Sequence, residues 1–153
     1  MKILILILLL NPAVAPQQLG CLCGKIAEGE KTHWGNSIRE PDIEKDKLKL
    51  VRGVVKVGND PLSGALVEVF DNPEARINRE PGSDPEDLGR KQNRVAACKT
   101  GGDGQFCFSN IPAGKYELRI SHQAAFDPES VIITVAAKGG SRKRLQVALR
   151  PGI

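Results

Sequence analysis

The stretch QFCFSNIPAGKYELRI at residues 105–120 decides the fold class. On each side of its Pro-Ala-Gly turn at residues 112–114, apolar side chains alternate with other side chains, as in Phe106-Cys107-Phe108. A period of two is typical of a strand that buries one face. Because two strands cannot hold an apolar face alone, the stretch predicts part of a larger sheet assembly.

Five more segments continue this pattern outward from the stretch. They are short, rich in aliphatic residues and close to turn-forming residues, at positions 50–57, 65–70, 94–100, 131–135 and 145–149. Together they predict seven strands over about 100 residues, with no helix, a spacing typical of a β-sandwich. Alternation predicts these inward positions: Val51, Val55, Val67, Val69, Phe106, Phe108, Tyr116, Leu118, Ile120, Ile133, Leu145, Val147 and Leu149.

Two cysteines lie on either side of a glycine-rich segment at residues 101–104, which predicts a hairpin turn between Cys98 and Cys107. Directly opposed Cβ atoms at a non-hydrogen-bonded site of such a hairpin approach disulfide distance. We therefore predict a Cys98–Cys107 disulfide. Since Phe106 and Phe108 point inward, this bridge is expected on the outer face of the sheet.

The N-terminus has the features of a secretory signal peptide. A positive residue, Lys2, precedes eight apolar residues at positions 3–10, which span roughly 12 Å as a helix and fall far short of a ~30 Å bilayer core. An Ala-x-Ala site ends at Ala15, so a leader at residues 1–15 is expected, although Pro16 directly after the site hinders cleavage.

A Cys-x-Cys motif, Cys21 and Cys23, follows the leader. The residues before Cys21 resemble the end of a bacterial lipobox, although Gln18 stands where an aliphatic residue is expected; a lipidated leader would extend to about residue 20. A second disulfide, local or intermolecular, is the other reading. Zinc would need two further ligands, and neither His33 nor His122 has ligand-type spacing, so no metal is expected.

One polar segment precedes the domain at residues 48–150, and a second polar segment lies within it. Residues 16–47 form a charged arm, expected to be extended or loosely ordered. Its His33 and Trp34 are candidate ligand contacts for a sugar or a peptide, the alternative being a Trp packed against the domain edge. Residues 71–93 are predicted to be a flexible insertion, with a ligand or partner loop as the alternative.

The net charge of +4, from 22 Lys and Arg against 18 Asp and Glu, is too even for a dedicated nucleic-acid binder. One basic cluster, on a predicted glycine-rich hairpin, comprises Lys138, Arg142, Lys143 and Arg144. We interpret it as a solvated hairpin tip, although four such cations could also touch an anionic lipid, a glycan or a nucleic acid. No aromatic residue lies among these cations, so no nucleic-acid partner is expected.

The strand motifs together resemble a known family. The motifs are Val51-x-Gly53-x-Val55, Pro61-Leu62-Ser63-Gly64-Ala65-x-Val67-x-Val69, Thr100-x3-Gly104-x-Phe106-x-Phe108, Ile111-Pro112-Ala113-Gly114-x-Tyr116-x-Leu118 and Leu145-x-Val147-x-Leu149. Over residues 48–150 the chain is similar to the carboxypeptidase regulatory-like domain, a transthyretin-like member of the wider carbohydrate-binding-like fold. The resemblance implies a seven-stranded Greek-key β-sandwich of the transthyretin (prealbumin) type and a non-catalytic accessory role.

No G-x-S-x-G, P-loop or H-E-x-x-H motif occurs in the sequence. We therefore expect an exported, non-enzymatic module with a structural, adhesive or ligand-binding role at the cell surface or in the periplasm, without a cofactor. Its partner is expected to be a protein or a glycan, with membrane contact only through a lipid on Cys21. A carbohydrate-binding module is the alternative reading, and a transthyretin-like hydrolase using His33 or His122 is a further one.

Overall fold

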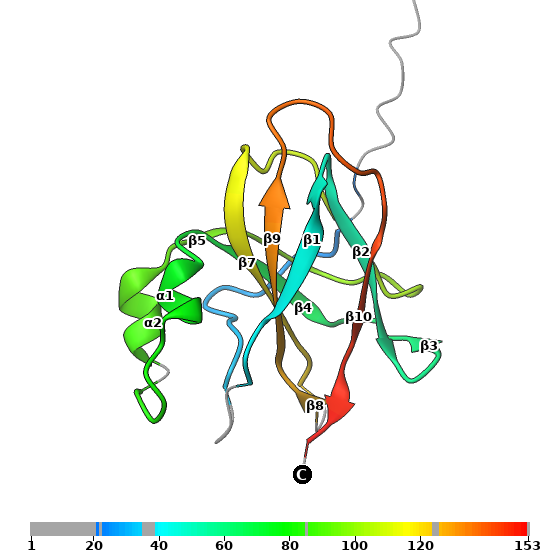
Figure 1. Cartoon of the computed structure of the whole chain (residues 1–153). Coiled ribbons are helices and arrows are strands. Elements are labelled where there is room, and N and C mark those ends of the chain that lie inside the picture. Colours follow the sequence, from blue (N-terminus) through cyan, green and yellow to red (C-terminus); the bar gives the residue numbers. More distant parts are fainter. Residues whose placement is uncertain (1–20, 22, 35–38, 85, 124–125, 153) are drawn as a thin grey trace, which may run out of the picture.

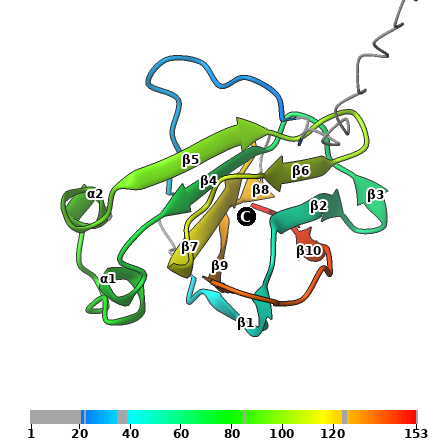
Figure 2. The same ribbon diagram turned by 90° about the horizontal axis from the view of Figure 1, so that it is seen from above.

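Two β-sheets carry the fold (Figures 1 and 2). The computed structural model describes residues 21, 23–34, 39–84, 86–123 and 126–152. The larger sheet, sheet A, has the strand order β1–β9–β7–β4–β5, in which β1 runs parallel to β9 and the other neighbours are antiparallel. Its strands are β1 (Asp42–Leu48), β4 (Leu66–Phe70), β5 (Arg94–Lys99), β7 (Gly114–Ser121) and β9 (Glu129–Val135).

The second sheet, sheet B, is built around β2 (Val51–Val57). One edge of β2 pairs in parallel with β10 (Leu145–Ala148), and the other pairs antiparallel with β6 (Gln105–Phe108) and β3 (Asp60–Pro61). A short pair joins β8 (Phe126–Asp127) to β11 (Arg150–Pro151). Apart from helices α1 (Glu74–Ile77) and α2 (Glu86–Lys91), the regular structure is β, so the protein is all-β.

Each of the seven predicted strands is present, as β2, β4, β5, β6, β7, β9 and β10. The count of seven is nevertheless wrong, because the described residues form eleven strands. The missed strand β1 ends the polar arm, so residues 42–48 belong to the domain. Its charged side chains hid it: β1 is an edge strand, and of its seven residues Leu48 alone is buried.

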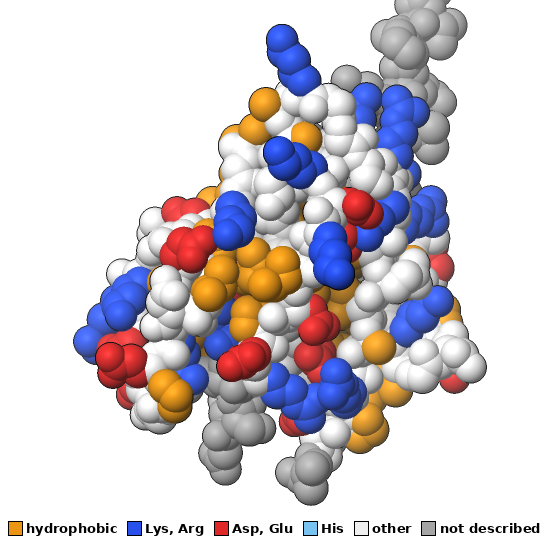
Figure 3. Space-filling model, in the orientation of Figure 1, with side chains coloured by type: hydrophobic (Ala, Val, Ile, Leu, Met, Phe, Trp, Pro, Cys, Tyr) orange, Lys and Arg blue, Asp and Glu red, His pale blue; other side chains and the backbone are white. Residues whose placement is uncertain are grey.

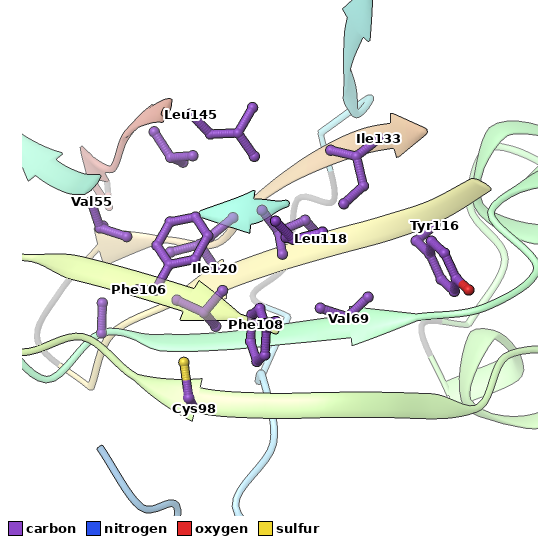
Figure 4. Packing of buried hydrophobic residues seen from close by; sticks show 14 of the residues in the cluster. Val55, Val69, Cys98, Phe106, Phe108, Tyr116, Leu118, Ile120, Ile133 and Leu145 are labelled. Atoms are coloured by element: carbon purple, nitrogen blue, oxygen red, sulfur yellow. The ribbon is translucent and has the colours of Figure 1, made fainter. Parts of the chain in front are cut away.

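The hydrophobic core lies between the two sheets (Figure 4). All thirteen residues predicted to point inward belong to this buried cluster. Figure 4 shows Val55, Phe106 and Leu145 of sheet B beside Leu118 and Ile120 of sheet A. The alternation was a reliable guide because both sheets contribute one apolar face to the same interior.

The predicted hairpin across residues 94–109 is wrong. β5 pairs with β4 in sheet A whereas β6 pairs with β2 in sheet B, so residues 101–104 cross between the sheets. Gly104 permits the crossing: its φ is +70°, and a Cβ there would lie 2.6 Å from the carbonyl oxygen of Val55. The carbonyl of Gly104 instead accepts the Val55 N–H at 2.9 Å.

The predicted Cys98–Cys107 disulfide is also wrong, for the same reason. The disulfides are Cys21–Cys107 and Cys23–Cys98. Cys98 lies in the core and is 2% exposed, not on an outer face. Cys21 and Cys23 do not pair with each other, and the sulfur of Cys21 is not available for a lipid because it is bonded to Cys107.

These two disulfides fasten the start of the arm to both sheets. Gly24 and Lys99 exchange two backbone hydrogen bonds, of 2.9 and 3.0 Å, so the arm runs antiparallel along the edge of β5 at this point. From there Cys23 reaches β5 in sheet A, and Cys21 reaches β6 in sheet B. The Cys-x-Cys motif therefore joins the two sheets at the edge where the chain crosses between them.

The insertion at residues 71–93 is not a structureless loop, contrary to prediction. It contains α1 and α2, and it buries Arg76 and Leu88, which are 4% and 3% exposed. Its ends are held together by a hydrogen bond from the Asp71 N–H to the Asn93 carbonyl at 3.0 Å and by one from the Asn93 N–H to the Asp71 carboxylate at 2.7 Å. Figure 1 shows both helices beside sheet A.

Candidate functional site

The face of sheet A that points away from the core carries charged side chains. On β7 the alternation that sends Leu118 inward sends Glu117 and Arg119 outward, and the register places Glu68 of β4 opposite Arg119. These outward side chains are nevertheless buried, with Glu68 and Glu117 at 0% and Arg119 at 5% exposure. The arm and the insertion cover them, and we call the resulting set of buried polar residues the outer-face layer.

Glu117 is the centre of one cluster in this layer. Its carboxylate accepts hydrogen bonds from Gln92 Nε2 at 2.9 Å, Arg119 Nη2 at 2.9 Å and Ser130 Oγ at 2.8 Å. Nε of Arg76 lies 3.3 Å from the same carboxylate. Since Arg76 and Gln92 belong to the insertion, these contacts fasten it to the sheet while satisfying a carboxylate that water does not reach.

Glu68 is the centre of a second cluster, which fastens the arm. Its carboxylate accepts hydrogen bonds from the backbone N–H of Thr32 at 2.9 Å, from the Thr32 hydroxyl at 2.6 Å and from Arg94 Nη1 at 2.9 Å. The Thr32 hydroxyl also lies 3.0 Å from that of Ser121, and Arg94 Nη1 donates to the carbonyl of Glu30 at 2.6 Å. The arm is therefore docked on the sheet by buried charge-assisted hydrogen bonds.

Trp34 packs on the guanidinium groups of this layer. Cζ of Arg76 lies 5.2 Å and Cζ of Arg119 lies 5.5 Å from the centre of its ring, and Arg119 also stacks at 3.8 Å on Phe70. Burial lowers the pKa of Arg76; the attraction of Glu117 opposes this effect, and the charge of Arg119 adds to it. Two guanidinium groups thus share the one carboxylate of Glu117.

A cleft of about 910 Å³ opens over the outer-face layer. Its lining comes from arm residues 29–34, from the insertion with the start of β5, and from β4 and β7. Most of its lining is polar or charged. The lining residues are Gly29, Glu30, Lys31, Thr32, His33, Trp34, Glu68, Phe70, Asp84, Gly89, Gln92, Asn93, Arg94 and Arg119.

The structure places both predicted ligand contacts at this cleft. Trp34 is half-buried and His33 is exposed. The alternative reading of Trp34, an aromatic packed against the domain, describes the same residue, because its ring lies on Arg76 and Arg119.

A second, smaller cleft of about 440 Å³ is lined by both histidines of the chain, together with Ser121 and Asp127. Nε2 of His122 lies 3.2 Å from the carbonyl oxygen of Ser63. Its ring meets Phe126 edge to face at 5.8 Å. Three arm residues, Glu30, Lys31 and His33, line both clefts.

The predicted basic hairpin is wrong in its geometry. Residues 136–144 cross from β9 in sheet A to β10 in sheet B, and Lys143 Nζ lies 2.6 Å from Glu44 and 2.9 Å from Asp46 of β1. Lys138, Arg142 and Arg144 are exposed. On the face shown in Figure 3, Lys and Arg side chains are interspersed with Asp and Glu rather than gathered in one patch.

The sequence analysis missed Glu68, Glu117 and Arg119, which it left on the solvent side of their strands. Their one sequence signal is the opposite charge of Glu117 and Arg119 two residues apart on one strand face. That signal does not distinguish a buried layer from a solvated one, because the cover comes from segments distant in sequence.

Among the described residues, His, Cys, Asp and Glu side chains form no group of three or more that could hold a metal ion. The two helices of the described part, with four and six residues, are too short to span a membrane, which takes roughly 20 residues. The two disulfides indicate an oxidising environment.

The fold and the site together define a disulfide-bonded all-β protein with a polar, Trp-containing cleft on the outer face of one sheet. The chain matches no family model and no curated protein.

Proposed function

We propose that the protein is an exported, non-catalytic β-sandwich module that binds a ligand in the 910 Å³ cleft, at the cell surface or in the periplasm. The observation that carries this proposal is the position of Trp34, half-buried in the lining of a polar cleft whose other lining residues include Glu68, Arg94 and Arg119, all held in ion pairs. Binding sites combine such a preformed hollow with a few fixed polar groups. A carbohydrate is the ligand class that this lining supports, because an aromatic ring among polar groups offers a sugar both stacking and hydrogen bonds.

The proposed fold within this all-β class is the transthyretin-like Greek-key sandwich of the carboxypeptidase regulatory-like domain. The strand motifs over residues 48–150 support it, together with the packing of all thirteen predicted inward residues between two sheets. The additional strand β1 and the helical insertion would then be extensions of this chain around a common core.

Export is part of the proposal. The predicted leader at residues 1–15 lies outside the described residues, and the support comes from the disulfides, which persist in oxidising compartments. N-terminal sequencing of protein recovered from the periplasm or medium should begin at residue 16. Recovery of full-length reduced protein from the cytosol would contradict export.

The binding function is tested on an array of neutral and acidic oligosaccharides. We expect the wild-type protein to bind at least one class and Trp34→Ala to lose that binding. Ile43→Ala, which removes an exposed apolar side chain on β1 outside the cleft lining, is the control and should bind as the wild type does. Mass spectrometry of the bound sugars should show them unchanged. The absence of binding to every glycan would overturn the proposal.

A hydrolase is the second candidate, favoured by one observation: His33 and His122 both line the smaller cleft. A hydrolytic activity in the wild-type protein that is lost in both His33→Ala and His122→Ala would establish it. Failure to detect turnover, or turnover unaffected by these variants, would leave the binding module as the function.

A further inference from the structure

The outer-face layer beneath the cleft contains more positive than negative charge. Three guanidinium groups, those of Arg76, Arg94 and Arg119, are paired with the two carboxylates of Glu68 and Glu117. Arg76 and Arg119 are buried and balance the two buried carboxylates, so the cation in excess is Arg94, whose side chain is 32% exposed. Arg94 lines the cleft, so this excess positive charge lies at the cleft itself.

The other carboxylates at the cleft do not restore the balance inside it. Glu30 is paired with Lys99 at 2.7 Å, and hydrogen bonds from Lys99 and from the Ala27 N–H lower its pKa. Asp84 and Lys31 are both exposed residues of the lining, so solvent screens both charges. Lys31 makes no ion pair with any other described residue.

Arg119 is itself incompletely satisfied. Its side chain is 6% exposed and lines the cleft, but its Nε finds no hydrogen-bond partner among the described residues. Because this Nε is buried, an anion in the cleft would meet Arg119 at the part of its side chain that lines the cleft.

The lining also favours a sugar over a peptide as the carrier of that anion. The lining contains Trp34 and Phe70, and the guanidinium of Arg119 lies 3.8 Å from the centre of the Phe70 ring. Arg76 and Arg119 lie farther from the centre of the Trp34 ring, at 5.2 and 5.5 Å, so a ligand would stack on the part of that ring which these groups leave free. A peptide anchor needs an apolar pocket. A sugar ring needs one aromatic face and polar neighbours, which Trp34 and this lining provide.

We propose that the cleft binds an acidic glycan, a uronic acid oligosaccharide, with its ring on Trp34 and its carboxylate near Arg119 and Lys31. This inference rests on the proposed function and specifies its ligand. A carboxylate accepts charge-assisted hydrogen bonds from guanidinium and ammonium groups, so each contact strengthens as the ligand displaces water.

The test is calorimetric titration with oligomers of galacturonate, alginate and hyaluronan, each compared with its carboxyl methyl ester. The ester keeps the sugar skeleton and removes the charge. We expect at least one acid to bind about tenfold or more tightly than its ester, and the affinity to fall as salt is raised.

Two charge-reversal variants locate the contact. Lys31→Glu should weaken acid binding by about tenfold or more, whereas Lys45→Glu, with the same charge change at an exposed position of β1, should not change it. Equal binding of acids and esters, or an equal effect of both variants, would overturn the acidic-ligand inference while leaving glycan binding in place. If no glycan of any kind binds, the proposed function fails as well.

Discussion

Gly53 occupies a crowded backbone position of sheet B. It lies on β2 with Leu145 of β10 paired on one side and Phe106 of β6 on the other. A Cβ at this position would come within 2.6 Å of the Leu145 carbonyl oxygen and 2.7 Å of the Phe106 ring. Neither neighbour can withdraw freely, because both are held in the sheet.

We therefore predict that Gly53→Ala lowers the free energy of unfolding by about 1–3 kcal/mol, measured by denaturant titration. The matched control is Gly89→Ala in α2, where a Cβ would have no neighbour within 4 Å. That variant should be as stable as the wild type or more stable by up to ~1 kcal/mol, since Ala favours a helix. Equal stability of the two variants would contradict the close packing at Gly53.

For single residues, burial could be predicted from the sequence on the inner face of the sheets but not on the outer face of sheet A. Inward positions such as Leu118 could be predicted because alternation needs only the strand itself. Glu68 and Glu117 could not, since the same alternation assigns both to the outer face and does not reveal what covers that face. Their burial depends on Thr32 and Gln92, which lie in segments with no periodic pattern.

Among the elements, the two disulfides of the Cys-x-Cys motif are the connections that can be tested most directly. We predict that Cys21→Ser leaves Cys107 as the one thiol that alkylates after denaturation, because the structure joins these two residues. Peptide mapping of the alkylated protein identifies the site. Alkylation at Cys98 would instead show that the pairing is exchanged. Loss of either bond should cost about 2–5 kcal/mol of stability, since each closes a long loop.

The helical insertion provides a second test at this scale. Leu88 of α2 is 3% exposed, whereas Ile77 of α1 is 39% exposed. Leu88→Ala should lower the free energy of unfolding by about 2–5 kcal/mol, and Ile77→Ala should cost much less, because truncation is costly where a cavity is left. If the two variants unfold at the same denaturant concentration as the wild type, the insertion is not part of the folded unit.

A pH-dependent contact joins β1 to the crossover at residues 136–144. Burial acts to raise the pKa of Glu44, but hydrogen bonds from Lys143 and the Asp46 N–H outweigh burial, so the pKa of Glu44 lies below its usual 4.5. The same pairing raises the pKa of Lys143 above its usual 10.5. The pair therefore stabilises the fold at pH values between the ordinary pKa of a glutamate, 4.5, and that of a lysine, 10.5. This stabilisation is lost as the pH falls through the lowered pKa of Glu44 or rises through the raised pKa of Lys143.

We accordingly predict that Lys143→Ala destabilises the protein at pH 7 and that the gap from the wild type closes as the pH falls below the pKa of Glu44. In a carboxyl NMR titration the pKa of Glu44 should rise in this variant, because burial then acts on it without the lysine. Lys138→Ala, which removes an exposed lysine of the same crossover, should leave that pKa where it is. A Glu44 titration identical in all three proteins would show that the pair does not form in solution.

Some strands could be predicted from the sequence and others could not, as was the case for single residues. Seven strands could be predicted because each carries its own apolar face, whereas β1 could not, as it is a charged edge strand. Strand connectivity was the weaker inference: residues 101–104 permit both a hairpin and a crossing, and the pairing of β6 with β2 decides between them. The disulfide prediction failed with that hairpin. His33 and Trp34 were predicted as ligand contacts and line the cleft, and residues 71–93, whose alternative reading was a ligand loop, also contribute to its lining.

At the scale of the whole molecule, the arm is a segment tied down at both ends. Cys23 fixes one end to β5 through its disulfide with Cys98, and β1 fixes the other by pairing with β9. Between these ties the arm is held by Thr32 on Glu68. While both ties persist, the segment between them can leave the outer face of sheet A only as a loop that is closed at both ends.

Trp34, the single Trp of the chain, reports on this docking. In the oxidised protein we predict that Trp34 fluorescence and far-UV circular dichroism follow one denaturant transition, because arm and sheets unfold together. After reduction of both disulfides the Trp34 transition should move to lower denaturant than the circular dichroism transition, since the Cys23 end of the arm is then held by noncovalent contacts alone. Thr32→Val, which removes the hydroxyl donor to Glu68, should widen that separation in the reduced protein. Separate transitions in the oxidised protein, or coincident ones after reduction, would contradict a covalent tether as the device that keeps the cleft closed on its arm side.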